Sequence, residues 1–421
     1  MFSSPRRLNL RLLCTNRRPV KKMFDIWPDL PIFIFAYHRG YDKTSQLTSR
    51  LTGVNNLITA LKQCDRVCEV NIQPIPNPLL KRFMKIKGPF PVLASLALRS
   101  IDEGVPVLPD SFLGGSAPRL QSLHLYSIPF PALGKLLLST SVLVDLSLDN
   151  IPYSGYIPPR AMVTCLSTLT RLESLVLNFQ SPRFPAARHL PQFTRVVLPA
   201  LTSFLFQGDS EYLEDIISQI DAPLLDRATI MFFNQLIFDT PRLRHFISRT
   251  PSFLISNQAH VVFSERIASV DLFLRNGTAD RRTLSLGILC VASDWQLSSL
   301  VQLCSLSLPP LTTLESLHIR QGHFRPSKWQ YDVEDTQWIE LFYPFTTVKD
   351  LYISRKFIEP VAPALQLLAG GEGAMEVLPG LQSLFLRSPH PSEHTQKAIS
   401  EFAISRQLSH QEKPTLTVSI G

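Results

Sequence analysis

One short apolar frame recurs along most of the chain and restricts the folds open to it. The frame consists of an apolar residue, two variable residues, an apolar residue, one variable residue and a third apolar residue. Copies begin at Val67, Leu93, Leu120, Leu143, Leu172, Leu201, Leu225, Ile267, Leu314, Val348 and Leu381, those at Val67, Leu225 and Ile267 being the weaker ones. Successive starts lie 23 to 29 residues apart as far as Leu225 and 33 to 47 residues apart beyond it. The shorter spacing is typical of a repeat made of one strand and a returning segment, and the longer spacing requires insertions.

The residues that lead into the frames also repeat. A proline stands two residues before five of the frames, at Pro91, Pro118, Pro199, Pro223 and Pro379. Proline ends a preceding helix and sets an extended entry into a strand. The sequence therefore predicts an α/β fold, an irregular leucine-rich-repeat solenoid. We expect a horseshoe-like form with parallel strands on the concave face and helices and loops outside.

The regular repeat is broken in recognisable places. Isoleucine replaces the usual asparagine nine residues into three successive repeats, at Ile101, Ile128 and Ile151, which predicts a looser superhelix. We assign residues 1–50 to a basic lead-in of strand plus loop and residues 51–421 to the solenoid. Within the solenoid we expect an insertion with a helix and a protruding excursion around 233–263 and a helical cap at about 392–408. Helices are predicted at 161–169, 210–220 and 335–342, and a final strand at 415–420.

Charge is concentrated at the amino terminus. The chain has a formal net charge of +8, and seven Lys and Arg with no acid lie in residues 1–24, so residues 25–421 carry 8 − 7 = +1. A nearly neutral body argues against a large nucleic-acid-binding face. For residues 1–24 three interpretations stay open: a transit peptide, an electrostatic anchor for nucleic acid or an acidic surface, and a short strand within Leu8–Cys14.

Cysteine use and hydropathy indicate the expected compartment. Six cysteines without a CxxC pair favour reduced thiols in the cytoplasm or nucleus. The longest strongly apolar run, Leu30–Tyr37, is broken by Pro31 and is too short to span a bilayer. We therefore expect no membrane association.

The sequence contains none of the usual catalytic or nucleotide-binding motifs. The glycine-rich stretch at 370–373 lacks a following lysine and is typical of a loop that ends a helix. His390 and His394 have Pro391 between them and lack further ligands, and Cys64 with Cys68 is typical of structural thiols. We expect a protein that is not an enzyme, with no cofactor and no metal.

Several longer sequence segments point to one family. They are Ser4–Leu10, Asp25–Pro31, Asp65–Val70, Phe238–Ile247, Leu308–Glu315 and the closing stretch Ala398–Leu408. Together with the frames they make the chain resemble the leucine-rich-repeat region of fungal, particularly basidiomycete, F-box proteins. The resemblance implies a substrate-recognition role in a cullin-type ubiquitin ligase.

An F-box itself is not recognisable. In the family the Ser-Pro-Arg-Arg segment, here Ser4–Arg7, follows the F-box, and nothing before Pro5 supplies one. We expect either a truncated gene model or a paralogue that keeps the recognition half. A Skp-type adaptor and a cullin are expected partners only if an F-box is supplied upstream. The alternatives are a stand-alone repeat scaffold and a binder of nucleic acid or an acidic surface through residues 1–24.

The expected partner is another protein, held on the concave face. Side chains between the apolar frame positions all point to that face, because successive side chains of a strand alternate. Arginine and aromatic residues among them are types enriched at binding hot spots. The candidate partner-binding residues are Arg99, His124, Tyr126, Asp145, Asp149, Asn178, Arg227, His318, Arg320, Asp350, Tyr352, Phe385 and Arg387.

Overall fold

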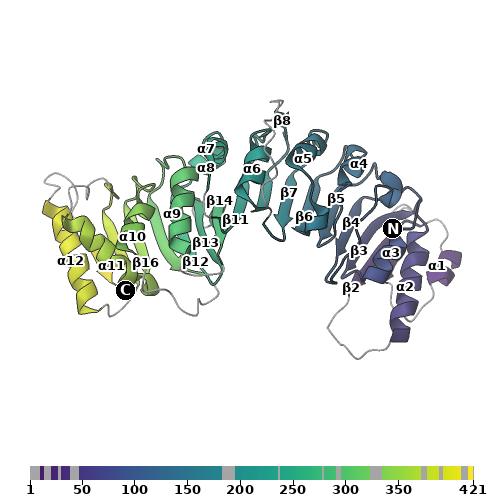
Figure 1. Ribbon diagram of the computed structural model, residues 1–421, viewed down its shortest axis with the longest axis horizontal. Helices are drawn as coiled ribbons and strands as arrows, with labels where there is room; N and C mark the ends of the chain where they lie inside the picture. Colours follow the sequence, from purple (N-terminus) through teal and green to yellow (C-terminus); the bar gives the residue numbers. More distant parts are fainter. Residues whose placement is uncertain are drawn as a thin grey trace, which may run out of the picture. The chain divides into compact units, whose positions relative to one another are not determined.

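The computed structural model shows a mixed α/β protein with a large, mostly parallel sheet. It describes residues 10–13, 20–26, 30–37, 47–182, 195–235, 238–276, 279–290, 295–322, 334–370, 377–387, 392–408 and 416–420. The chain divides into two compact units (Figure 1), and the division falls inside strand β9 (Ser203–Gly208). Unit 1 comprises Met1–Leu205 and Gln219–Leu224, and unit 2 comprises Phe206–Ser218 and Leu225–Gly421.

In unit 1 neighbouring strands of the sheet follow one another in chain order, from β1 to β7, and their printed pairs are parallel. The short strands β8 and β10 form a separate parallel pair. The strands are β1 (Leu10–Leu13), β2 (Ile32–Tyr37), β3 (Val67–Gln73), β4 (Ser95–Arg99), β5 (Ser122–Tyr126), β6 (Asp145–Ile151), β7 (Ser174–Phe179), β8 (Val196–Val197) and β10 (Ile220–Asp221). The helices are α1 (Val20–Ile26), α2 (Leu47–Leu61), α3 (Asn77–Phe83), η2 (Phe112–Gly115), α4 (Leu133–Leu138), η3 (Tyr153–Gly155) and α5 (Pro159–Leu166).

In unit 2 the strand order is β11-β14-β13-β12-β15-β16-β17-β18. Strand β13 is antiparallel to both of its neighbours, and the other printed pairs are parallel. The strands are β11 (Arg227–Phe233), β12 (Gln258–Phe263), β13 (Ile267–Asn276), β14 (Ala279–Leu289), β15 (Ser316–Gln321), β16 (Asp350–Ser354), β17 (Ser383–Arg387) and β18 (Thr417–Ile420). The helices are α6 (Ser210–Ile217), α7 (Pro241–Ser248), α8 (Pro251–Leu254), α9 (Gln296–Ser307), α10 (Asp335–Phe342), α11 (Arg355–Gly370) and α12 (Glu393–Leu408).

Every frame found in the sequence contains a strand, which confirms the strand predictions. Equivalent frame positions lie opposite one another: Leu123 lies opposite Leu96 on one side and Leu146 on the other. In unit 2 Leu351 is likewise paired with Leu317 and Leu384. These leucines are 0–1% exposed. In each unit the large sheet therefore buries continuous rows of apolar side chains on one face.

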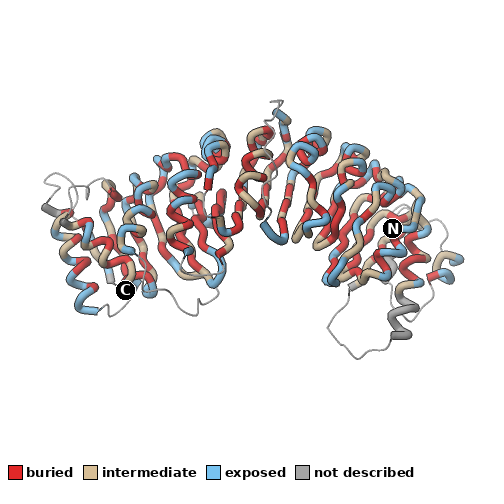
Figure 2. Tube along the Cα trace, in the orientation of Figure 1, coloured by how far each residue is buried: buried red, intermediate tan, exposed pale blue. Residues whose placement is uncertain are grey.

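Helices cover that apolar face within each unit, and Figure 2 shows the buried residues gathered where strands and helices meet. In unit 2, α9 lies against β13 and β14, while α11 lies against β15, β16 and β17. Trp338 of α10 and Phe357 of α11 both contact the ring of Phe263 in β12. No helix in the described ranges is long and apolar enough to cross a membrane.

A buried carboxylate joins two successive helices of unit 2. Glu214 on α6 accepts hydrogen bonds from the backbone N–H groups of Arg242 (3.0 Å) and Leu243 (2.7 Å), in the first turn of α7. These N–H groups have no partner inside their own helix, and the helix dipole favours a negative charge there. Burial raises the pKa of the Glu214 carboxyl, and the two backbone hydrogen bonds oppose that rise.

The structure differs from the sequence expectations at several elements. Residues 258–263, expected in a protruding excursion, form β12, which pairs with strands on both sides, and the strand at Ile267 is antiparallel instead of parallel. The helix expected at 210–220 ends at Ile217, because the chain enters β10 at Ile220. Residues 1–50 contain α1, β2 and the start of α2 in addition to the expected strand, β1. Most of the basic residues of 1–24 and the stretch 371–376 lie outside the described residues.

The rows of buried leucines make a direct prediction about stability. Leu123→Ala in β5 should lower the free energy of unfolding by about 2–5 kcal/mol, because a fully buried leucine is replaced by a cavity. The matched control is Leu138→Ala at the end of α4, where the side chain is 55% exposed, and it should change stability by less than about 0.5 kcal/mol. Urea unfolding followed by circular dichroism measures both, and equal losses would contradict the register described above.

Candidate binding surface

The sheet face opposite the buried leucines carries the residues between the frame positions, and we call it the variable face. In unit 1 the candidate residues of this face mostly interact with one another. The Arg99 guanidinium lies 4.5 Å from the ring centroid of Tyr126, and Asn178 Nδ2 donates to Asp149 Oδ1 at 2.7 Å. Of the remaining candidates in this unit, His124 is exposed and Asp145 is half-buried. Four of the six candidates of this unit are thus engaged with one another, although Asn178 Oδ1 has no hydrogen-bond partner among the described residues.

The variable face of unit 2 carries a continuous row of rings, which we call the aromatic row. It runs through Phe273 on β13, His260 on β12, His318 on β15, Tyr352 on β16 and Phe385 on β17. The ring centroids are 4.4, 4.7, 4.2 and 4.4 Å apart in that order. The planes of His318 and Tyr352 differ by 2°, and those of Tyr352 and Phe385 by 7°, so these three rings form one stack.

The strand register explains why the rings stack. His260, His318, Tyr352 and Phe385 lie directly opposite one another on four successive parallel strands. Adjacent strands are about 4.8 Å apart, and their side chains stand roughly perpendicular to the sheet. Planar side chains at one register position therefore meet face to face at nearly their contact distance. The same register that aligns the buried leucines aligns these rings.

Both histidines of the row are held neutral. Burial lowers the pKa of His260 to about 3, with further lowering by Arg320, His318 and Arg387. Burial also lowers the pKa of His318 to about 4, assisted by Arg387 and Arg320, although Asp280 opposes the shift. Desolvation and neighbouring positive charge act in the same direction, because both disfavour a charged imidazole.

Hydrogen bonds around the histidines agree with a neutral state. Gln258 Nε2 lies 2.7 Å from His318 Nε2, and a hydrogen bond donated by the amide nitrogen to this ring nitrogen fits a neutral imidazole. Among the described residues neither ring nitrogen of His260 has a hydrogen-bond partner, although the residue is only 7% exposed. Asp271 lies opposite His260 in the register, and its carboxylate accepts a hydrogen bond from the hydroxyl of Ser285.

Arginines border the stacked rings. Arg320 on β15 and Arg387 on β17 each follow the ring of their own strand by two residues, and Ser354 is paired with Arg387 between them. Arg275, on β13, lies close enough to lower the pKa of His318. All three arginines are exposed, and their side chains make no ion pair within the described part of the chain.

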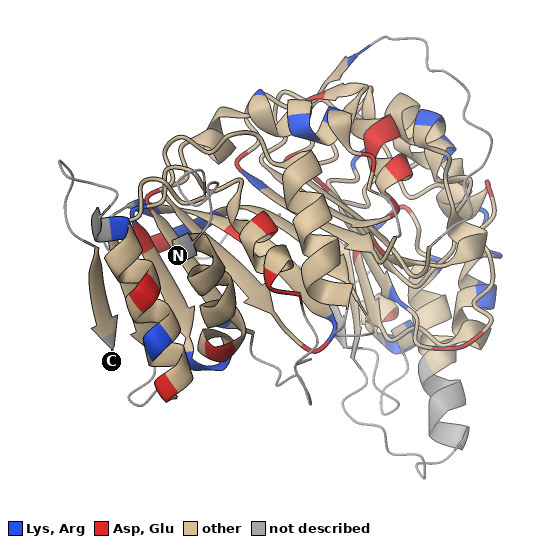
Figure 3. Ribbon diagram, turned by 60° about the vertical axis from the view of Figure 1, so that its left-hand side comes forward, with Lys and Arg blue, Asp and Glu red and all other residues tan. Residues whose placement is uncertain are grey.

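Elsewhere, acidic and basic residues are interspersed (Figure 3). Along α12, for example, Lys397 lies 3.9 Å from Glu401. Arg320 and Arg387 differ from this pattern because no acidic residue lies opposite either of them in the printed register, whereas Arg275 lies opposite Asp280.

The structure brings some sequence candidates together and separates others. Within unit 2 it unites His318, Tyr352 and Phe385 in the stack, with Arg320 and Arg387 beside it. Asp350 lies on the same face, two residues before Tyr352, and contributes to raising the pKa of its hydroxyl, after burial.

One candidate of unit 2 does not join this group. Arg227 stands on β11, which is separated from β12 by β14 and β13. It is exposed at the start of its strand and has no part in the aromatic row.

Sequence reasoning missed the part of the row that β12 and β13 supply. Strand β12 lacks a complete frame because Ser256 occupies the first apolar position. The alternation of Ala259, Val261 and Phe263 is nevertheless present and is a strand signal on its own. Read in that way, the alternation would have placed His260 on the variable face.

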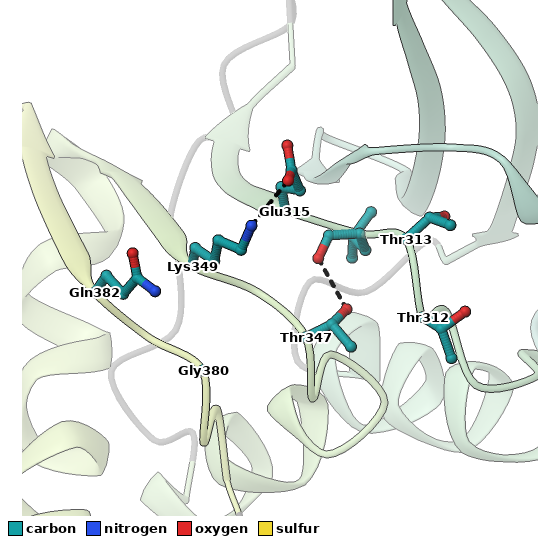
Figure 4. Close-up of a pocket in the computed structure, with 8 residues that line it drawn as sticks. Thr312, Thr313, Glu315, Thr347, Lys349, Gly380 and Gln382 are labelled. Atoms are coloured by element: carbon teal, nitrogen blue, oxygen red, sulfur yellow. Dashed lines mark hydrogen bonds and ion pairs between the residues drawn. The ribbon is translucent and has the colours of Figure 1, made fainter. Parts of the chain in front are cut away.

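A separate hollow of about 410 Å³ lies where the chain enters β15, β16 and β17 (Figure 4). Its charged groups already pair, with Lys349 Nζ 2.9 Å from Glu315 Oε1, and both side chains are about half exposed. Thr347 Oγ1 donates to the carbonyl oxygens of Leu311 and Leu314, both at 2.8 Å. These contacts tie neighbouring repeats together, so the hollow is explained by the packing of the chain.

The described residues contain no group of three or more His, Cys, Asp or Glu arranged to hold a metal ion. Comparison with known proteins found no family model that matches the chain and no curated protein that matches it. The aromatic row and its arginines are accordingly interpreted from their geometry.

The neutral histidines predict a specific pH dependence of stability. Their folded-state pKa values lie below the ordinary value of 6.5, so they contribute stability above that pH and lose it as the pH falls from 6.5 toward about 3 to 4. The loss should approach about 1.4 kcal/mol per pH unit for each histidine. Urea unfolding between pH 7 and 5 should show this slope in the wild type and a flatter slope in H260Q/H318Q.

His245, which is exposed on α7, supplies the control for this experiment. The variant H245Q should keep the wild-type slope. Parallel curves for the wild type and H260Q/H318Q would show that the two imidazoles are not desolvated in the native state.

Proposed function

We propose that the chain is a non-catalytic, leucine-rich-repeat interaction module that binds another protein on the variable face of unit 2. The repeated frames, the strand in each frame and the mostly parallel sheet support the leucine-rich-repeat assignment. The single observation that carries the binding role is the aromatic row. In the described residues, rings and arginines gather on the sheet face opposite the buried leucines. They are the residue types that dominate binding energy in protein interfaces.

Following the family resemblance, the interaction module acts as the substrate-recognition part of a cullin-type ubiquitin ligase. Two of the sequence segments that carry this resemblance are Phe238–Ile247 and Leu308–Glu315. The first leads into α7 and includes most of it, and the second leads into β15. Both lie in unit 2, and the second leads directly into the strand that bears His318. The ligase role extends the binding role, and the two are tested separately.

Photo-crosslinking tests the binding role. A benzoylphenylalanine residue in place of Tyr352, at the centre of the stack, should cross-link to a discrete protein in extracts of the source cells. The control position is Tyr153, which is 75% exposed in unit 1 and should give no such product. Phe385→Ala beside the label should reduce the yield about tenfold or more, since truncating a central aromatic residue of an interface costs about 2 kcal/mol or more. An undiminished yield would contradict binding at the aromatic row.

The ligase role is tested by purifying the tagged chain from its source cells and scoring for a cullin and a Skp-type adaptor. Recovery of both with the cross-linked partner supports the ligase assignment. Recovery of the partner with neither of them would remove the link to ubiquitin ligation and leave the binding role intact.

A further inference from the structure

Two of the arginines beside the aromatic row, Arg320 and Arg387, have no acidic residue opposite them in the printed strand register, whereas Arg275 lies opposite Asp280. Arg275, Arg320 and Arg387 are exposed and without ion pairs among the described residues. Of the acids nearby, Asp271 is buried and accepts a hydrogen bond from Ser285. Asp280 and Asp350 are the other acids whose charge reaches His318 or Tyr352. The side chains of Arg320 and Arg387 are thus available to a negatively charged ligand.

The rings themselves favour the same sign of ligand charge. In the stack of His318, Tyr352 and Phe385 each inner ring face is covered by its neighbour. Because the side chains stand up from the sheet, the stack presents ring edges to a ligand. An aromatic ring is negative on its face and positive at its edge, so the exposed part of the stack attracts anions and repels cations.

The covered faces also decide between two classes of anionic partner. Single-stranded nucleic acid binds by stacking its bases on open aromatic faces. Tyr352 has a ring on each side of it, at 4.2 and 4.4 Å, so a base has no access to its faces. The row therefore suits carboxylates better than nucleobases.

The spacing of the arginines sets the form of the partner. Arg320 and Arg387 stand two strands apart, about 10 Å, with Ser354 in the row between them. An extended chain advances about 3.3–3.6 Å per residue, so carboxylates two or three residues apart span about 7–11 Å. One extended segment that crosses β15, β16 and β17 places acidic side chains beside both arginines.

We propose that the partner segment seated on the aromatic row is an extended acidic peptide, whose carboxylates pair with Arg320 and Arg387. This inference rests on the proposed function and names the chemistry of the segment that is bound. Charge-assisted contacts between guanidinium and carboxylate groups are short, directional and bidentate, which suits arginines that stand at fixed register positions.

Fluorescence anisotropy with defined probes and the full chain tests the inference. The first probe is a labelled peptide of about a dozen residues that alternates glutamate and serine, and the second carries glutamine in place of glutamate. A third probe is single-stranded oligothymidine of similar length. At low salt we expect binding of the glutamate peptide, at least tenfold weaker binding in R320Q/R387Q, and much weaker binding of both other probes.

The control variant R160Q/R171Q removes the same charge from exposed positions of unit 1 and should bind the glutamate peptide like the wild type. Circular dichroism and urea unfolding verify that both variants are folded. Equal weakening in the two variants would overturn the inference, because it would reduce the effect to net charge. Binding of oligothymidine that exceeds glutamate-peptide binding and is lost in R320Q/R387Q would overturn it in favour of nucleic acid.

The histidines supply a second readout that bulk charge does not move. A peptide seated beside Arg320 and Arg387 should shift the imidazole resonances of His318 in NMR spectra at pH 7, where glutamate is ionised and this imidazole is neutral. Unchanged imidazole resonances in the presence of saturating peptide would show that the peptide binds away from the row.

These outcomes separate the inference from the proposed function. A cross-link at Tyr352 that persists in R320Q/R387Q, together with no binding of the glutamate peptide, refutes an acidic segment and keeps the binding face. Peptide binding that depends on Arg320 and Arg387, without any cross-link at Tyr352, refutes the protein partner and keeps the anion-binding property of the row.

Discussion

The strand register is the constraint on which the rest of the structure depends. Leu317, Leu351 and Leu384 lie directly opposite one another, because the apolar positions of each strand gain most when they bury the same row. Residues one position further along are then aligned as well, on the other face of the sheet. The packing of the core therefore also stacks the rings of His318, Tyr352 and Phe385, without further interactions to align them.

The aligned side chains of the variable face differ in kind between the two units. In unit 1, Arg99 rests on Tyr126 and Asn178 donates to Asp149, so the aligned side chains satisfy one another across strands. In unit 2 the aligned side chains are rings, which bury one another's faces. In unit 2, exposed arginines lie beside imidazoles whose pKa values are strongly lowered by burial, and shifted pKa values of this kind are common at functional sites.

The sequence predicted the strands well and the topology only in part. Apolar spacing shows which residues share a face, so the strands at frames such as Leu314 and Val348, and with them His318 and Tyr352, could be predicted. Alternation of side chains reads the same in both directions of a strand, however, so nothing at Ile267 reveals that β13 runs antiparallel. His260 was missed for a related reason: its strand lacks the first apolar residue of the frame, and only pairing on both sides identifies it as part of the sheet.

The reversed strand has a consequence for how unit 2 forms. In a simple repeat each new strand adds to the edge left by the one before, but here the neighbour of β11 is β14, and β12 and β13 come before β14 in the chain. While the chain is being made, the edge of β11 stays open until residues 279–289 emerge, and β12 is the first strand able to occupy it. The native partner of that edge, β14, runs parallel to β11. The sheet of unit 2 therefore contains a non-local pairing, that of β11 with β14, which a simple repeat-by-repeat array lacks.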